Sequence, residues 1–290
     1  MSIIAFWSNG REETAKTLSI AAISTYMAIQ HNYKILSVST TYNDDTLQTC
    51  FWRPERQQQT VFPELGVRKN DIASGVEGLA KAISSNKVTP EIITNYTKIV
   101  FKDRLEVLLG PSTSSYQEYE KFIPMYTEIL KSANKYYDLI FVDLNKGLEK
   151  EGILDVLTIA DLIVVNITQR LKIIDDVIAL KEKYPIFNRR NIMYLIGRYD
   201  KFSKYSSKNI ARYMGEKKEI ATIPYNTLFF EACNEGKIVD YFLRYRRIDT
   251  EDRNAIFISE VNKTCDKIIY KLQELQMRNW PIKKFNVKYY

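Results

Sequence analysis

Short, continuous apolar runs alternate along this chain with longer stretches in which apolar residues recur every third or fourth position. Continuous runs are typical of strands buried on both faces of a sheet, and the wider spacing is typical of helices with one buried face. The predicted strands are Ile3–Trp7, Lys34–Ser39, Leu105–Leu109, Tyr137–Asp143, Leu162–Ile167, Ile192–Gly197 and Ile220–Ile223. The predicted helices are Leu18–Ile29, Glu118–Ala133, Ile173–Lys183 and Arg253–Met277. This alternation predicts an α/β fold with a single doubly wound, mainly parallel sheet flanked by helices.

Residues 52–100 depart from this alternation. Prolines, Gly75, Gly78 and the run Gln57–Gln59 interrupt any regular spacing there, so we expect an irregular helical insertion. The chain has 290 residues, of which 45% are hydrophobic, and this is enough to bury a large core. We therefore expect one domain over residues 1–277, followed by a basic, aromatic tail over residues 278–290.

A candidate phosphate-binding loop joins the first predicted strand to the first predicted helix. Residues 10–17 read Gly-Arg-Glu-Glu-Thr-Ala-Lys-Thr, which matches G-x-x-x-x-G-K-[ST] except that Ala15 replaces the second glycine. In such a loop, backbone N–H groups and the helix N-terminus attract an anion. The nucleotide-binding residues that we expect are Gly10, Arg11, Glu12, Glu13, Thr14, Ala15, Lys16, Thr17 and Leu18.

Within this loop, Lys16 and Thr17 have distinct expected roles. Lys16 would reach the terminal phosphates, and the Thr17 hydroxyl would bind Mg²⁺ between them. If position 15 requires a positive φ, the Cβ of Ala15 adds strain of about 1 kcal/mol. The alternative is an ordinary strand-to-helix turn with an incidental Lys-Thr pair.

A second candidate magnesium ligand ends the predicted central strand. Asp143 closes the apolar run Tyr137–Asp143, and ligands of parallel sheets bind beyond the carboxyl ends of the strands. A carboxylate at this point holds Mg²⁺ in P-loop proteins. The alternative role for Asp143 is to cap the loop that follows. Together with the upstream loop, its position favours the magnesium role.

Charge and rare residue types narrow the remaining possibilities. The net charge is +7, from 42 basic and 35 acidic residues, which suits nucleic acid, anionic lipid or nucleotide phosphate and does not choose among them. The three cysteines have no disulfide or metal spacing, so we expect a reducing, cytoplasmic setting. The single histidine, His31, ends the first predicted helix and is expected to be structural. Neither a leader peptide nor a membrane span is predicted.

In their order, the motifs resemble those of the MinD/ParA family of deviant-Walker ATPases, which includes the pilus-localisation protein TadZ. The loop is similar to the family's K-G-G-x-G-K-[ST], and Tyr137–Gly147 is similar to a strand followed by V-D-x-P-x-G. Further similar segments are Ala160–Val165, Ile196–Asp200 and Ile223–Gly236. The resemblance covers most of the chain and leaves residues 52–100 unmatched.

The resemblance implies ATP and Mg²⁺ as ligands and a nucleotide-dependent homodimer. It places Arg11 at the family's signature lysine, which acts on the partner's nucleotide, and it gives Lys16, Arg11 and Asp143 the catalytic roles. Arg198 would stack on the base, while Pro224 and Asn226 would line its edge. Gly197 replaces an asparagine that contacts the base, so weaker discrimination between adenine and guanine is expected.

Two departures from the family pattern affect hydrolysis and binding. Glu12 and Glu13 bring negative charge close to the expected phosphates unless they point outward. Thr41 occupies the position of the aspartate that orients the attacking water, so slow or impaired hydrolysis is expected. Asp44 or Asp45 could replace it if the loop folds back, and the alternative is a solvated Asn-Asp-Asp turn. Lys146 occupies a position where the family has a small residue.

The predicted function is a nucleotide-dependent dimeric switch that positions a partner machinery for plasmid partition, pilus or secretion assembly, or division-site placement. The alternative is a degenerate, non-hydrolysing scaffold or adaptor. Nonspecific DNA binding through Arg244, Arg246 and Arg247 is a further candidate. Membrane attachment through residues 278–290 is less favoured, because Pro281 disrupts a tail helix. A cytoplasmic protein recruited to a pole, the nucleoid or a membrane-associated complex is expected, with an unidentified protein partner.

Overall fold

A computed structural model describes residues 1–9, 14–53, 75–85, 90–111, 113, 115–145, 147–148, 152–249, 252 and 254–279. Within them, eight strands form one sheet in the order β3-β4-β2-β5-β1-β6-β7-β8. Neighbouring strands pair in parallel except β3, which runs antiparallel to β4 at one edge. The strands are β1 (Ser2–Trp7), β2 (Ile35–Ser39), β3 (Lys98–Phe101), β4 (Leu105–Leu108), β5 (Leu139–Asp143), β6 (Leu162–Ile167), β7 (Ile192–Tyr199) and β8 (Ala221–Pro224).

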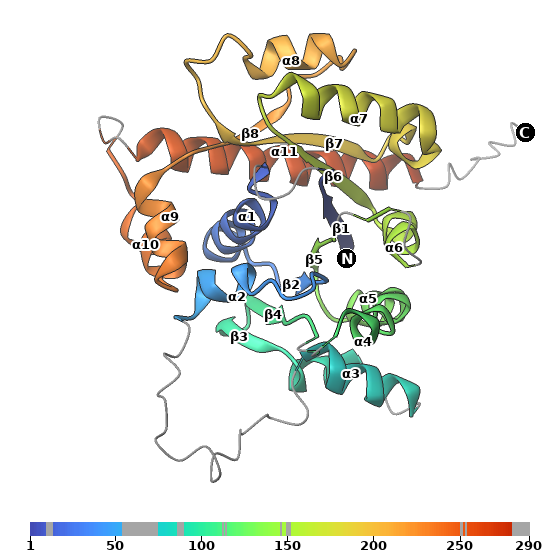
Figure 1. Ribbon diagram of the computed structural model, residues 1–290. Coiled ribbons are helices and arrows are strands. Elements are labelled where there is room, and N and C mark those ends of the chain that lie inside the picture. The colour runs from blue at the N-terminus through green and yellow to red at the C-terminus, as the bar shows by residue number, and fades with distance from the viewer. Residues whose placement is uncertain are drawn as a thin grey trace, which may run out of the picture.

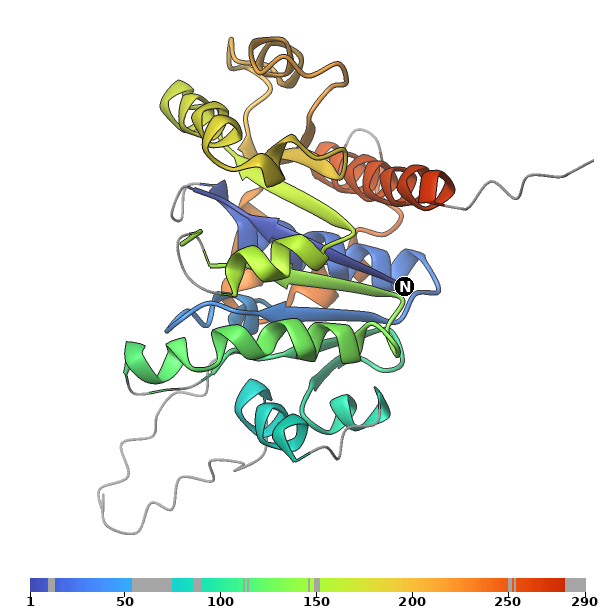
Figure 2. The same ribbon diagram turned by 90° about the vertical axis from the view of Figure 1, so that its right-hand side faces the viewer.

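Helices cover both faces of this sheet (Figure 1). One face carries α1 (Lys16–Gln30), α2 (Thr46–Phe51), α9 (Thr227–Asn234), α10 (Ile238–Arg244) and α11 (Ala255–Asn279). The other face carries α3 (Gly75–Ser84), α4 (Tyr116–Glu120), α5 (Tyr126–Ala133), α6 (Ile153–Ile159), α7 (Leu171–Lys183) and α8 (Ser207–Tyr213). Figure 2 shows α5 and α6 in front of the strands and α3 beside the lower edge of the sheet. Short 3₁₀ turns span Pro90–Asn95, Ile123–Met125 and Pro185–Asn188.

The central strands are mostly apolar because they are buried on both faces. In β1, Ile4 and Phe6 enter the core beneath α1, and Ile3 and Trp7 enter the core on the opposite face. Every residue of β1, β2, β5 and β6 is buried. The doubly wound, mainly parallel sheet predicted from the apolar runs is confirmed.

Two predicted stretches differ from the structure. The expected helix Glu118–Ala133 is divided into α4 and α5, because Pro124 lies in the 3₁₀ turn between them and cannot donate a backbone hydrogen bond to a continuous helix. Residues 52–100 were expected to be irregular and helical, and they also begin the edge strand β3. Strand β3 contains the apolar run Ile99–Phe101, which at three residues is too short to stand out from the irregular stretch before it.

Candidate functional site

The predicted phosphate loop enters α1 through a strained residue. Ala15 has φ 46° and ψ 37°, a left-handed conformation that glycine adopts without cost. Position 15 therefore does have a positive φ, the condition under which the sequence analysis expected strain. The Cβ of Ala15 makes this conformation costly. Gly10, Arg11, Glu12 and Glu13 lie outside the described residues, so their roles stay predictions.

Three side chains of the predicted site meet at the carboxyl ends of β1 and β5. The Thr17 hydroxyl donates to Asp143 Oδ2 at 2.6 Å, although the two residues are 126 positions apart. Lys16 Nζ lies 2.6 Å from Asp143 Oδ1 and also donates to the Leu144 carbonyl. Oδ1 accepts no hydrogen bond of regular geometry, so its contact with Lys16 is an ion pair. The side chain of Asp143 is 1% exposed and that of Lys16 is 13% exposed.

The backbone around Asp143 is fixed from both neighbouring strands. Asp143 pairs with Phe6 in β1 and Ser39 in β2. Its carbonyl accepts hydrogen bonds from the N–H and the hydroxyl of Thr40. The backbone that carries the carboxylate is therefore rigidly held, and a side chain that ligates a metal needs such support for a defined geometry.

The oxygen atoms of Thr17 and Asp143 fit a nucleotide-bound Mg²⁺. Magnesium takes one or two protein oxygens in such sites and completes its shell with water and phosphate. The hydroxyl and carboxylate described above supply such a pair. No group of three or more His, Cys, Asp or Glu side chains with metal-site geometry occurs among the described residues.

Buried polar atoms without partners lie near this loop. Thr14 Oγ1 and both side-chain amide atoms of Asn166 have no hydrogen-bond partner, and both residues are fully buried. Asn166 interrupts the apolar run of β6 and points to the α1 face of the sheet, because its neighbours in the strand, Val165 and Ile167, point to the other. Unsatisfied buried groups of this kind are uncommon in folded proteins and are typical of sites that a ligand or water completes. The sequence analysis did not single out Asn166, although an asparagine within an apolar strand is a usable signal.

The end of β2 carries a hydrogen-bond network in place of a catalytic carboxylate. The hydroxyl groups of Tyr119 and Tyr126 donate to the carbonyls of Thr40 and Ser39. Burial raises the pKa of Tyr126 well above its usual value, so its hydroxyl remains protonated as the donor. Asn145 Nδ2 donates to the Tyr119 hydroxyl. This network ties the strand end before Thr41 to the segment after Asp143.

The loop after Thr41 forms a solvated turn. Asn43 has φ 49°, and the Asp44 carboxylate accepts a hydrogen bond from the N–H of Thr46 at the start of α2. Asp44 and Asp45 are both exposed. The described conformation is thus the turn that the sequence analysis gave as the alternative, and neither carboxylate stands in for the missing aspartate.

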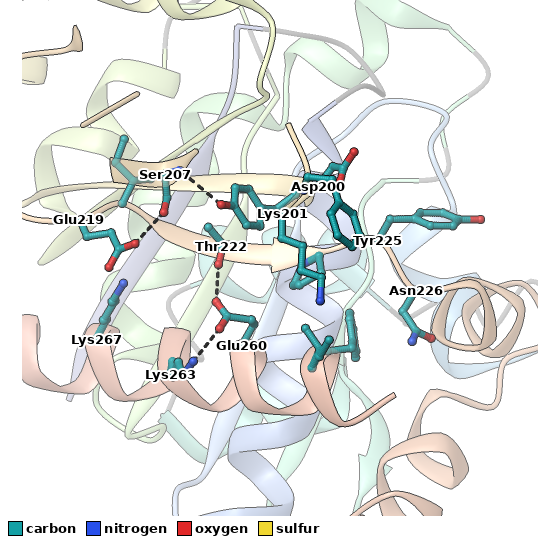
Figure 3. Close-up of a pocket in the computed structure, with 16 residues that line it drawn as sticks. Asp200, Lys201, Ser207, Glu219, Thr222, Tyr225, Asn226, Glu260, Lys263 and Lys267 are labelled. Carbon is teal, nitrogen blue, oxygen red and sulfur yellow. Dashed lines mark hydrogen bonds and ion pairs between the residues drawn. The ribbon is translucent and has the colours of Figure 1, made fainter. Parts of the chain in front are cut away.

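The predicted base-binding residues fall into two groups. Pro224 and Asn226 line a cavity of about 410 Å³ between β8 and α11, whereas Arg198 and the described loop residues 14–18 do not line it (Figure 3). Arg198 is exposed and has φ 52°. The Asn226 side chain caps α9 by accepting from the N–H of Phe229, and it also donates to Asn254. Its amide is therefore already engaged within the protein.

Close packing explains why residue 197 is a glycine. A Cβ at Gly197 would lie 2.0 Å from the carbonyl oxygen of Thr14. The backbone of the phosphate loop therefore rests directly on β7, and an asparagine side chain does not fit unless the loop moves. The asparagine that the resembled family has at this position would therefore meet the Thr14 backbone here.

Comparison with known proteins finds similarity at the level of structure. Neither protein-family models nor curated protein sequences match the chain. A ParA family ATPase from Chlorobium tepidum is 15% identical, with a TM-score of 0.67 over 93% of this chain and 98% of that one. MinD from Pyrococcus horikoshii, in complex with Mg-ADP, is 17% identical, with a TM-score of 0.64 over 93% and 99%. The chain has the fold of MinD/ParA-type P-loop ATPases.

A variant of McdA from Cyanothece in complex with ATP is also similar, at 14% identity and a TM-score of 0.62 over 94% of this chain and 96% of that chain. These matches confirm the predicted resemblance in fold. Identities this low carry no residue roles, so the assigned roles and the TadZ subtype stay predictions.

The remaining predicted contact surfaces are only partly described. Arg244, Arg246 and Arg247 are exposed at the end of α10 and in the segment that follows. Helix α11 extends to Asn279, beyond the predicted end at Met277, and tail residues 280–290 lie outside the described residues, as does Lys146. Among the described helices, none combines the length and apolar character required to cross a bilayer.

Proposed function

We propose that this protein binds Mg-ATP and acts as a nucleotide-dependent dimeric switch that positions a partner machinery. The observation that carries the proposal is the convergence of the Lys16 ammonium, the Thr17 hydroxyl and the Asp143 carboxylate at one end of α1. In the described conformation Asp143 holds Lys16. An incoming phosphate competes for this ammonium, and a bound Mg²⁺ would neutralise phosphate charge beside Thr17 and Asp143.

The fold supports the positioning role. The similar structures include a ParA family ATPase and a MinD named as a septum site-determining protein. In the resembled family, the signature lysine acts across the dimer, and Arg11 would take that role here. Nucleotide binding without dimerisation would leave Arg11 with no partner to act on, so the oligomeric state is the property to measure.

Light scattering tests the switch directly. The purified chain is expected to double its mass on addition of Mg-ATP, whereas Lys16→Ala is expected to remain a monomer. Lys135 is exposed shortly before the amino end of β5, at the sheet edge opposite the loop, so Lys135→Ala provides a matched control that should dimerise normally. A wild-type mass that Mg-ATP does not change would reject the proposal.

A non-hydrolysing scaffold is the second candidate function, and Thr41 favours it. The Thr41 hydroxyl lies 2.8 Å from the Ser39 hydroxyl, and neither Asp44 nor Asp45 takes the place of the aspartate that the resembled family has there. Phosphate release separates the candidates. A slow rate that Lys16→Ala abolishes supports the switch, and an equal background rate in both proteins supports the scaffold.

A further inference from the structure

A long groove follows α11 on the side of the edge strand β8. The cavity of about 410 Å³ described above and a second one of about 580 Å³ share Glu219, Ile220 and Lys267 in their walls, so the two adjoin. We call the two cavities together the α11 groove. On α11 it extends from Ile256 to Lys271, a rise of about 22 Å, which corresponds to about seven residues of extended chain.

Exposed apolar side chains gather in the α11 groove. Phe202 is 86% exposed, Tyr225 56%, Ile256 46% and Tyr270 62%, and all four line its walls. Single exposed apolar residues are ordinary, but several in one groove are typical of an interaction site. These four side chains add little to the two cores of the protein, because much of the surface of each side chain is exposed to water.

The charges of the groove favour an acidic occupant. Lys263, Lys267 and Lys271 recur every fourth residue along α11, so they form a stripe on one face of the helix, and Figure 3 shows the first two beside the cavity. Lys267 forms no ion pair with any described residue. Nor does Lys217, which also lines the groove.

Lys263 pairs with Glu260, and Lys271 and Lys218 pair with Glu274, so Lys267 and Lys217 are the cations that an occupant would meet first. The carboxylates of the groove are engaged as well. Glu219 accepts a hydrogen bond from Ser207. Although burial raises the pKa of Glu260, contacts with Lys263 and Thr222 lower it below its usual value overall, and Glu260 remains ionised. The lining of the two cavities contains six lysines (201, 217, 218, 263, 267 and 271) and four carboxylates (200, 216, 219 and 260). The groove is therefore lined by more cations than anions and by several exposed apolar side chains.

We propose that the α11 groove docks an acidic segment of a partner protein, whose glutamate or aspartate side chains meet the lysine stripe and whose apolar side chains contact Phe202, Tyr225 and Tyr270. Nucleic acid is disfavoured, because the four carboxylates would face a continuous line of phosphates. The proposal goes beyond the nucleotide switch and needs none of the phosphate-site residues.

Fluorescence anisotropy with a defined probe tests this docking. The probe is a labelled peptide of about ten residues that alternates glutamate and leucine, long enough for the groove. It is expected to bind saturably, and Lys267→Glu is expected to weaken it about tenfold, since charge reversal removes one attraction and adds a repulsion. Phe202→Ser, at a highly exposed position that should not disturb folding, is expected to weaken it by a few-fold.

The matched control is Lys172→Glu, which reverses an exposed charge on α7 and should change peptide affinity less than about twofold. Absence of saturable binding, or equal losses in Lys267→Glu and Lys172→Glu, overturns the proposal. So does tighter binding of single-stranded DNA of equal length that Lys267→Glu abolishes, because the groove would then be a nucleic-acid surface.

Calorimetry with Mg-ATP on the same proteins separates this proposal from the proposed function. Lys267→Glu should bind Mg-ATP as the wild type does. If the wild-type chain binds the acidic peptide and no nucleotide, the docking groove stands and the nucleotide switch fails.

Discussion

The phosphate side and the base side of the candidate nucleotide site differ in how completely they are assembled. On the phosphate side, Lys16, Thr17 and Asp143 contact one another at the ends of buried central strands. On the base side, Asn226 caps a helix and Gly197 lies under the Thr14 carbonyl. The phosphate-side residues are arranged around a common point, whereas the base-side residues are engaged in packing and helix capping.

From this difference we expect recognition of the phosphates to tolerate fewer changes than recognition of the base. Phosphate binding depends on a cation, a hydroxyl and backbone N–H groups, which few substitutions can replace. Base binding uses broader surfaces, and stacking tolerates different side chains because every base has a π-face. The predictions that follow test the two sides separately.

The close approach at Gly197 gives the largest expected effect. Gly197→Ala is expected to destabilise the fold by about 3 kcal/mol, because its Cβ would overlap a backbone oxygen that only a loop shift can move. Gly215→Ala is the control: nothing lies within 4 Å of its added Cβ, and its positive φ alone costs about 1 kcal/mol. Urea unfolding measures both, and equal losses would contradict the packing explanation.

Thr17→Val tests the magnesium side of the phosphate site. The substitution keeps the shape and removes the hydroxyl, so Mg-ATP affinity is expected to fall about tenfold. Without magnesium, in excess EDTA, wild type and variant should bind ATP alike. Calorimetry in the two buffers decides, and an equal loss in both would place Thr17 outside the metal site.

Asn226→Ala tests whether capping or base contact dominates at that position. We expect a loss of about 1 kcal/mol in unfolding free energy from the missing N-cap. The ratio of ATP to GTP affinity should not change. If stability is retained while ATP affinity drops, Asn226 contacts the base instead.

Ala15→Gly has the smallest expected effect and the opposite sign. Relief of the left-handed strain is partly offset by the greater chain entropy of glycine, so a net gain of about 0.5 to 1 kcal/mol is expected. Ala28→Gly, within α1, should instead lose about 1 kcal/mol. Thermal unfolding of the pair reads out the difference, and a loss in Ala15→Gly would show that position 15 is not strained.

Much of the fold was predictable because the central strands are buried on both faces. Leu162–Ile167 is a strand in the structure with the bounds predicted, since a continuous apolar run leaves little choice. The edge strand Lys98–Phe101 was missed, because its apolar run is only three residues long and follows an irregular stretch. Pro124 indicates the break between α4 and α5, but the apolar spacing on both sides of it favoured one continuous helix.

For the candidate site, the residues of the phosphate side were predictable because their motif fixes both residue type and order. The contact between Thr17 and Asp143 followed from the rule that parallel strands end at the same edge. The capping role of Asn226 was not predictable in the same way, since an asparagine after a strand serves a base or a helix equally well. Nor does the sequence reveal that the Thr14 carbonyl rests on Gly197, because that contact depends on the path of the loop.

Titration calorimetry of the wild-type chain with Mg-ATP tests the nucleotide site most directly, with Lys16→Ala as the comparison. Saturable binding of one nucleotide per chain is expected, and Lys16→Ala should weaken it about a hundredfold, because a charge-assisted contact to the terminal phosphates is lost. Thermal unfolding of the variant must show that it remains folded, since Asp143 loses its ion-pair partner. Absence of binding to the wild type, or equal affinity in a folded Lys16→Ala, would contradict a phosphate site at this loop.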